Sequence, residues 1–124
     1  MNEKILLVDD EETTLGIVGL LLQAAGYEVD ARRGGFEALE AFARDPHSFD
    51  LVISDQCMES MSGVVLAKKL LQTRPGTPIV ILTGDGETAK AGAEGVGIRG
   101  FVQKPVTIGQ LVRSIDEALA CPAV

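Results

Sequence analysis

Several residue types that carry chemistry in other proteins are scarce in this chain of 124 residues, which has no tryptophan, one histidine and two cysteines. Cys57 and Cys121 lack the close spacing of a thiolate metal site, so we expect reduced thiols in a cytoplasmic protein. His47 lies in a turn-forming segment, where we expect a solvated loop residue. No apolar run approaches the roughly 20 residues of a membrane span, and none resembles a signal peptide. We therefore expect no membrane partner.

Basic residues are also few, with 11 lysines and arginines against 18 acidic residues and a net charge of −7. Proteins that bind nucleic acid usually have a basic face, so we expect no direct nucleic-acid partner. Part of the acidic excess is concentrated in residues 9–12, directly after an apolar run. Acid gathered at the end of a strand suggests a cation site. The length and the apolar share of 46% fit one domain, residues 1–124, with a core of its own.

Three short runs, at residues 5–8, 51–54 and 79–82, are apolar except for Ser54 and are typical of strands buried on both faces. A weaker run at 101–103 predicts a fourth strand, and the alternating residues 28–31 predict an edge strand. Helical spacing of apolar residues lies between these runs. The predicted helical stripes are Leu15, Val18, Leu22 and Ala25, ended by Gly26; Phe36, Leu39 and Ala43; Gly63, Leu66, Ala67, Leu70 and Leu71; and Ile108, Leu111, Val112, Ile115 and Leu119, preceded by a Thr107–Gln110 capping box.

The segment 87–97 is the weakest helical candidate, because it contains three glycines that each cost a helix roughly 1 kcal/mol relative to alanine. We expect a short helix there. A strand followed by a helix, repeated five times, predicts a single doubly wound α/β domain, (βα)5, with a parallel sheet and right-handed crossovers.

Polar residues follow the strands at their carboxyl ends, where such sheets gather their functional groups. They are Asp9, Asp10, Asp55, Thr83 and Lys104. Oxygen ligands alone favour a hard cation such as Mg²⁺. A lone carboxylate at a strand end, Asp55, can attack phosphorus and form an acyl phosphate. The cation, the Lys104 ammonium and the Thr83 hydroxyl would then each take one phosphoryl oxygen. The plainer alternative is that Asp9 and Asp10 merely cap the first helix.

From end to end, the chain resembles a response-regulator receiver domain of two-component signalling. The resemblance rests on Asp9–Asp10, Asp55, Met58, Gly63, Thr83 and Lys104–Pro105. It implies a flavodoxin-like sheet of order 2-1-3-4-5 and a cis peptide bond before Pro105. It also implies a Mg²⁺ or Mn²⁺ site formed by Asp9, Asp10, Asp55 and Cys57.

The same resemblance implies a function. A histidine kinase or a histidine phosphotransfer protein would donate a phosphoryl group to Asp55, and Thr83 and Phe101 would move to alter the face that binds a downstream effector protein or a fused domain. Phe101 as a plain core residue is the alternative. We expect no enzyme activity beyond self-phosphorylation from small donors and self-dephosphorylation. The runs Asp55–Met58 and Leu66–Leu70 also resemble receivers of hybrid sensor kinases.

Three departures from the family pattern lie near the acceptor. Glu59 replaces a common proline, which frees a backbone angle and adds an anion, so we expect a looser loop. Gly84 replaces a common alanine and leaves more access to a phosphoryl group. Cys57 and Asp85 flank the path of hydrolytic water, and we expect both to change the lifetime of the acyl phosphate.

Three other functions remain open from the sequence. Residues 9–13 approach the Asp-x-Asp-x-Thr motif of a small aspartate-dependent phosphatase, in which Asp9 and not Asp55 would be phosphorylated. A flavodoxin-like cofactor binder shares the fold, although acid after the first strand disfavours a bound phosphate. A receiver-like module that acts unphosphorylated is the third. We also expect a monomer that dimerises at most weakly.

Overall fold

The computed structural model describes residues 2–93 and 95–120, and its five strands form one sheet in the order β2-β1-β3-β4-β5. All four neighbouring pairs of strands are parallel. The predicted doubly wound α/β fold and its strand order are confirmed. The strands are β1 (Lys4–Val8), β2 (Glu28–Arg32), β3 (Leu51–Asp55), β4 (Ile79–Thr83) and β5 (Gly100–Gln103).

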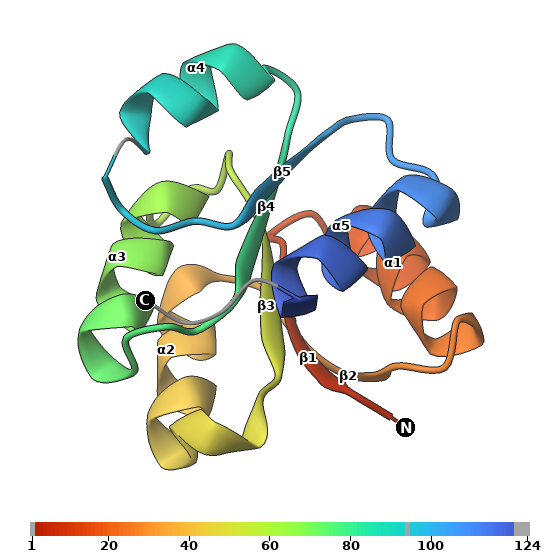
Figure 1. Ribbon diagram of the computed structural model, residues 1–124, viewed down its shortest axis with the longest axis horizontal. Helices are drawn as coiled ribbons and strands as arrows, with labels where there is room; N and C mark the ends of the chain where they lie inside the picture. The colour runs from red at the N-terminus through yellow and green to blue at the C-terminus, as the bar shows by residue number, and fades with distance from the viewer. Residues whose placement is uncertain (1, 94, 121–124) are drawn as a thin grey trace.

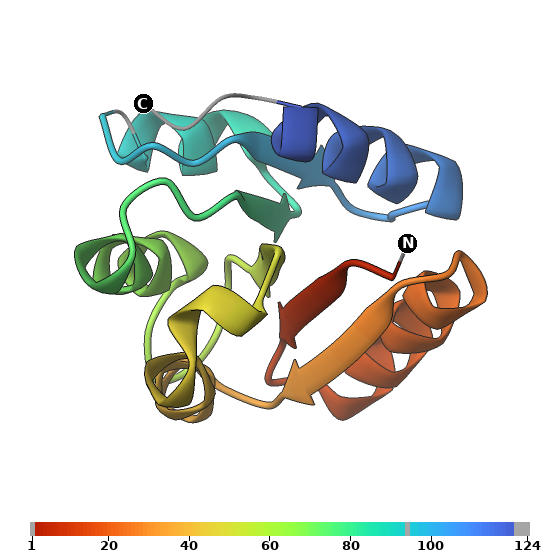
Figure 2. The same cartoon turned by 60° about the horizontal axis from the view of Figure 1, so that its bottom comes forward.

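Five α-helices connect and follow these strands: α1 (Glu12–Ala24), α2 (Gly35–Arg44), α3 (Gly63–Thr73), α4 (Gly86–Gly92) and α5 (Ile108–Ala120). Helices α1 and α5 lie on one side of the sheet, whereas α2, α3 and α4 lie on the other (Figures 1 and 2). The single histidine, His47, lies in a short 3-10 turn, Pro46–Ser48, between α2 and β3. It precedes the start of β3 and so lies at the opposite end of that strand from Asp55.

Two apolar clusters hold the layers together, one between the sheet and α1 with α5, the other between the sheet and α2 with α3. The apolar side chains of β1, β3 and β4 are almost completely buried. Each such burial stabilises the fold by roughly 1.5–3 kcal/mol. Strand β2 is only partly buried and lies at an edge of the sheet, as its alternating sequence predicted.

The helix ends follow local rules that the sequence shows. Helix α1 is capped by the Glu11 carboxylate, which accepts hydrogen bonds from the N–H groups of Thr13 and Thr14. After it, Gly26 has φ +99°, a left-handed conformation that suits glycine at a helix end. Helix α5 begins with the predicted capping box, in which Thr107 and Gln110 exchange side-chain to backbone hydrogen bonds.

The predicted buried face of α2 is right for Leu39, which is partly buried against the core, but wrong for Phe36 and Ala43. Phe36 is 64% exposed, and Ala43 is exposed as well. The helix instead buries Ala38, Ala41 and Phe42, and Phe42 stacks on Phe49 with ring centroids 6.0 Å apart. Alanines on the inner face let the helix backbone approach the sheet, and the large aromatic side chain at the helix start faces outward.

The fourth helix is short, as predicted, but it ends at Gly92 and not at residue 97. Gly95 and Gly97 have φ +78° and +100°, so the chain turns there in conformations that a helix does not allow. In the described part of the chain, no helix is both long and apolar enough to cross a membrane. Cys121 lies outside the described residues.

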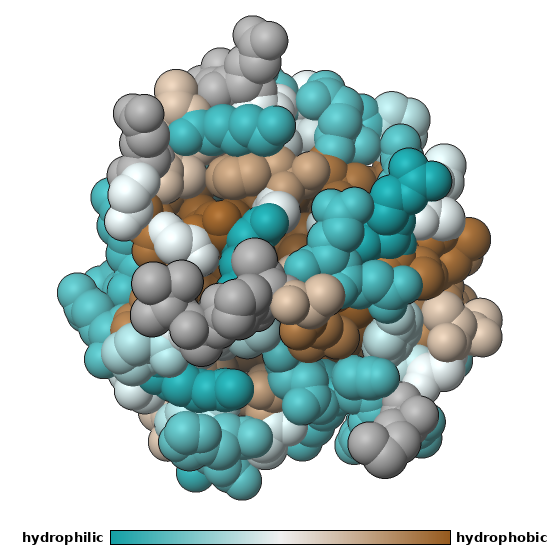
Figure 3. Space-filling model, in the orientation of Figure 1, coloured by the Kyte–Doolittle hydropathy of each residue, from teal (hydrophilic) through white to brown (hydrophobic). Residues whose placement is uncertain are grey.

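The surface is mostly polar, and brown apolar areas are broken up by teal side chains on the face that Figure 3 shows. Helix α1 is an exception, since Ile17 and Leu20 are 55% and 68% exposed. A cavity of about 470 Å³ lies beside this helix and reaches Lys104 and Pro105.

Candidate functional site

Strand register brings the predicted site residues to one edge of the sheet. Val8 pairs with Ser54, so the next residues, Asp9 and Asp55, end neighbouring strands side by side. Strand β4 continues one residue further to Thr83, which pairs with Gln103 of β5. The following residue, Lys104, donates its backbone N–H to the Thr83 carbonyl oxygen at 2.8 Å.

An ion pair joins the ends of β3 and β5 across the intervening strand β4. The Lys104 Nζ lies 2.5 Å from Asp55 Oδ1, and the Asp55 side chain is only 7% exposed. Burial is the largest influence on Lys104 and lowers its pKa, but the hydrogen bond and charge of Asp55 outweigh it, so the pKa is raised overall. Lys104 is therefore a fixed cation beside the predicted acceptor. The peptide bond between Lys104 and Pro105 is cis, as predicted.

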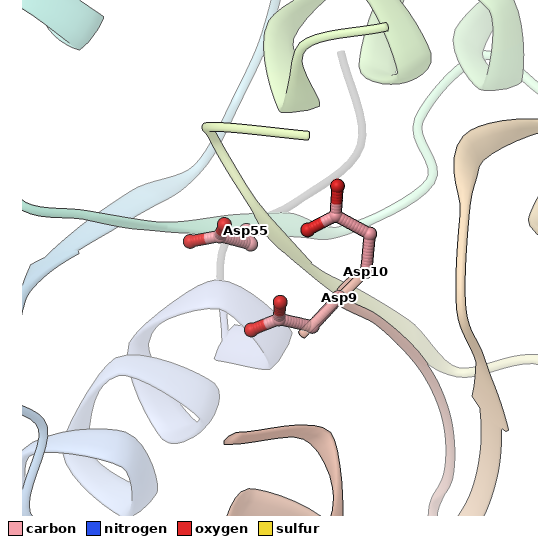
Figure 4. Close-up of side chains that lie close together, drawn as sticks. All are labelled: Asp9, Asp10 and Asp55. Atoms are coloured by element: carbon pink, nitrogen blue, oxygen red, sulfur yellow. The ribbon is translucent and has the colours of Figure 1, made fainter. Parts of the chain in front are cut away.

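Three carboxylates converge beside this ion pair. Asp9, Asp10 and Asp55 each offer an oxygen, and these oxygens lie within 4.8 Å of one another (Figure 4). Burial is the main cause of a raised pKa for Asp9, and the charges of Asp55 and Asp10 raise it further. A metal ion would relieve this clustering of negative charge, and an all-oxygen donor set suits a hard cation. The residues present therefore fit the predicted cation.

The capping alternative for the acidic pair is not what the structure shows. The N-cap of α1 is Glu11, and Asp9 Oδ1 accepts the Glu11 N–H at 2.9 Å without bonding into the helix. Asp10 Oδ2 accepts an N–H from a different loop. The remaining oxygens of both residues face the space beside Asp55 in Figure 4.

Asp10 connects the loop after β1 to the loop after β3. Its Oδ2 accepts the backbone N–H of Glu59 at 2.8 Å. Proline, which is common in the family at this position, has no N–H to donate. We predicted that Glu59 loosens this loop, but its N–H forms a hydrogen bond that restrains the loop and that proline could not form.

Glycine at position 63 allows the same loop to return to the sheet. A Cβ on Gly63 would lie 2.5 Å from the Asp55 carbonyl oxygen, a distance that backbone atoms cannot accommodate. Ser62 then caps α3 by accepting the Val65 N–H, and the Gln56 side chain accepts the Val64 N–H. This lack of space for a side chain explains why the family pattern has glycine at this position.

Thr83 is 3% exposed and its hydroxyl is engaged with its own loop. The hydroxyl accepts the Asp85 N–H and donates to the Asp85 carbonyl oxygen, both at 3.1 Å. Phe101 is partly buried and packs against the apolar cluster on the α2 and α3 side. This geometry holds Thr83 in a local turn, and the switch roles of Thr83 and Phe101 stay predictions.

The remaining predicted residues lie around the rim of the site. Cys57 is a free, exposed cysteine, and its sulfur does not belong to the group of three carboxylates, so its place among the ligands stays a prediction. Gly84 is exposed, and a Cβ added to it would meet no atom within 4 Å, so an alanine would fit there. Asp85 is exposed beside it.

Sequence reasoning missed Gln103. Its side-chain amide donates to the Gly84 carbonyl oxygen at 2.6 Å and accepts the Gly86 N–H at 3.2 Å. A glutamine at the end of a strand has no distinctive pattern, and only the paired strands β4 and β5 bring it to this loop.

The Glu59 hydrogen bond yields a prediction about the cation. We expect Glu59→Pro to weaken Mg²⁺ binding about three-fold, because it leaves the Asp10 carboxylate without the donor that orients it. Glu59→Ala keeps the N–H and removes the same anion, so it is the matched control and should bind at least as well as the wild type. Isothermal titration calorimetry measures all three. Equal affinities in the proline and alanine variants would contradict this role.

Comparison with known proteins supports the resemblance. Residues 5–116 match the family described as response regulator receiver domain. The transcriptional regulatory protein GlrR of Escherichia coli K12 is 39% identical over 116 residues, which are 93% of this chain and 26% of GlrR. YkoG of Bacillus subtilis, an uncharacterized transcriptional regulatory protein, is 34% identical over 93% of this chain and 50% of its own length. The chain thus spans a quarter to a half of these relatives.

Solved structures agree. A response regulator receiver domain protein of Clostridium thermocellum superposes with a TM-score of 0.89 at 33% identity, covering 95% of this chain and 94% of that one. The response regulator TrrA of Thermotoga maritima, solved in complex with Mg²⁺ and beryllium fluoride, superposes with a TM-score of 0.85 at 28% identity, covering 94% and 99%. Given the family match, the strand order and the convergent site, this chain belongs to the response regulator receiver domain family, the phosphorylation-dependent switches of two-component signalling.

Proposed function

We propose that Asp55 is the phosphoacceptor and that a phosphohistidine of a kinase or of a phosphotransfer protein is the donor. One observation carries this assignment: among the clustered carboxylates, Asp55 is the one that pairs with the Lys104 ammonium at the end of a fully buried strand. An Asp55 oxygen forms the new bond to phosphorus, the phosphorus–nitrogen bond of the donor breaks, and the electron pair leaves with the imidazole, which takes up a proton.

The neighbouring side chains divide the charge that develops. Asp9, Asp10 and Asp55 would hold Mg²⁺, which when bound neutralises phosphoryl oxygens. Lys104, already beside Asp55, keeps its ammonium next to the transferred group. The Thr83 hydroxyl gives up its bonds to the Asp85 backbone and donates to a phosphoryl oxygen. This division favours Asp55 over Asp9, the nucleophile that a phosphatase would require.

The receiver alters a partner through the face formed by α4, β5 and α5. Phe101 lines a shallow pocket of about 260 Å³ between β5 and α5, together with Gln103, Gln110 and Arg113. A side chain that turns inward from this position changes the surface a partner meets. We propose that the partner is an effector domain or protein, as the names of the regulatory relatives suggest. The resemblance to hybrid kinase receivers stays a prediction.

Intact-mass spectrometry after incubation with acetyl phosphate and Mg²⁺ tests the assignment. We expect a single phosphoryl addition to the wild type that is absent from Asp55→Asn and absent when Mg²⁺ is removed by chelation. Asp116→Asn, an exposed aspartate on α5, is the matched control and should be modified like the wild type. Addition that survives Asp55→Asn would move the chemistry to Asp9 or Asp10. No addition to the wild type, even with a histidine kinase as donor, would favour a module that acts unphosphorylated.

A further inference from the structure

The side chains of Thr83 and Gln103 hold the loop between β4 and α4 from opposite sides. The loop consists of Gly84 and Asp85. Thr83, the residue before the loop, hydrogen-bonds through its hydroxyl to the N–H and to the carbonyl oxygen of Asp85. Gln103, on the neighbouring strand β5, hydrogen-bonds through its side-chain amide to the carbonyl oxygen of Gly84 and to the N–H of Gly86.

The orientation of the Gln103 amide follows from its partners. A carbonyl oxygen can only accept and an N–H can only donate, so the amide nitrogen must face Gly84 and the amide oxygen must face Gly86. A rotated amide would oppose oxygen to oxygen and N–H to N–H. The contact with Gly86 is close, since a Cβ there would lie 3.2 Å from the amide oxygen. The glutamine thus fits the loop in one arrangement.

Gln103 and Phe101 share one face of β5, because side chains two residues apart point to the same side of a strand. Phe101 packs on the cluster on the α2 and α3 side, so Gln103 also projects toward the side of the sheet where α4 lies. The loop that Gln103 holds is the one that Thr83 must rearrange when its hydroxyl leaves Asp85. Gln103 therefore bonds to the moving part of the proposed switch.

We propose that the Gln103 amide is a positioning device that keeps the β4–α4 loop in its resting conformation and opposes the phosphorylated one. It touches no reacting atom. It acts through the loop, by stabilising the conformation in which Thr83 is bonded to Asp85. This inference rests on the proposed phosphorylation at Asp55, and it assigns to this chain a brake that shifts the equilibrium between its two forms.

Beryllium fluoride with Mg²⁺, used as a mimic of the phosphoryl group, provides the test. The Kd is measured by two-dimensional NMR on the wild type and on Gln103→Leu and Gln103→Glu. Leucine removes both hydrogen bonds. Glutamate keeps an acceptor for the Gly86 N–H but places an oxygen against the Gly84 carbonyl oxygen. We expect both variants to bind the mimic about five-fold more tightly than the wild type. Without the mimic, their unfolding free energies should fall by about 1 kcal/mol, the free energy that corresponds to a five-fold change in affinity. Gln72→Leu makes the same change at an exposed position of α3 and should leave the Kd for the mimic unchanged.

The outcomes separate this inference from the proposed function. A wild type that does not bind beryllium fluoride overturns both. A wild type that binds, beside Gln103 variants of unchanged or weaker affinity, overturns the brake and leaves Asp55 as the acceptor. Tighter binding by Gln103→Leu but not by Gln103→Glu also overturns it, because an effect of apolar packing, not of the lost hydrogen bonds, would then explain the result.

Discussion

Without divalent cations, replacing Lys104 by methionine is expected to lower the free energy of unfolding at pH 7 by about 2 kcal/mol. The variant leaves the buried Asp55 carboxylate beside Asp9 without its cation. Removal of one partner from a fully buried pair costs roughly 3–5 kcal/mol, and the smaller value expected here reflects solvent screening of a side chain that is 34% exposed. Urea denaturation followed by circular dichroism measures the difference.

The pH dependence of this loss has a definite sign. The pKa of Lys104 is raised in the folded protein, so the ammonium stabilises the fold fully below its unfolded pKa, about 10.4. That stability is lost as the pH rises through the folded value. The gap between wild type and variant should therefore be present at pH 7 and close as the pH rises through the raised folded pKa of Lys104.

Lys69→Met is the matched control, because Lys69 is exposed on α3 and remote in sequence from the site. We expect it to change the unfolding free energy by less than about 0.5 kcal/mol. If Lys104→Met cost no more than Lys69→Met, the ion pair would be excluded as a source of stability. Combining Lys104→Met with Asp55→Asn completes a double-mutant cycle, in which the double variant should recover most of the loss.

The fold is predictable because its strands are unambiguous. Residues 5–8, 51–53 and 79–82 are apolar without interruption, which is typical of strands covered on both faces. Parallel order then places the residue after each strand at one edge of the sheet. This rule places Asp9, Asp55 and Lys104 at one edge of the sheet, and the strand order that brings them close was implied only by the family resemblance.

Other features depend on geometry that the sequence does not encode locally. The spacing of Phe36 predicts a core position, but α2 buries a face that contains Ala38 and Ala41 and leaves Phe36 exposed. The Glu59 N–H reaches Asp10 only because two loops 49 residues apart meet at the site. Gln103 contacts the β4–α4 loop only through the pairing of β4 with β5. Both hydrogen bonds join segments that are far apart in the chain, and no local sequence pattern predicts them.

Replacing Asp9 by asparagine is expected to have opposite effects on the metal-free and the Mg²⁺-bound domain. Burial raises the pKa of Asp9, so its ionised form is unfavourable in the folded state. Asparagine removes that charge, and its amide oxygen still accepts the Glu11 N–H. We expect the metal-free variant to be more stable than the wild type at pH 7 by on the order of 1 kcal/mol. This advantage should shrink as the pH falls through the folded pKa of Asp9 and the wild type becomes protonated.

With Mg²⁺ the ranking should reverse. A cation a hundredfold above its Kd stabilises the wild type by about 2.7 kcal/mol, and a variant that has lost one of three carboxylate ligands should gain far less. Thermal unfolding with and without Mg²⁺ measures both effects, and Asp116→Asn on α5 controls for the loss of one negative charge. A metal-free variant less stable than the wild type would show that Asp9 is structural, and a full Mg²⁺ response would remove it from the ligands. The charge that destabilises the empty site is the one that the bound cation requires. Asp116→Asn keeps that charge, so its metal-free stability and its stabilisation by Mg²⁺ should both match those of the wild type.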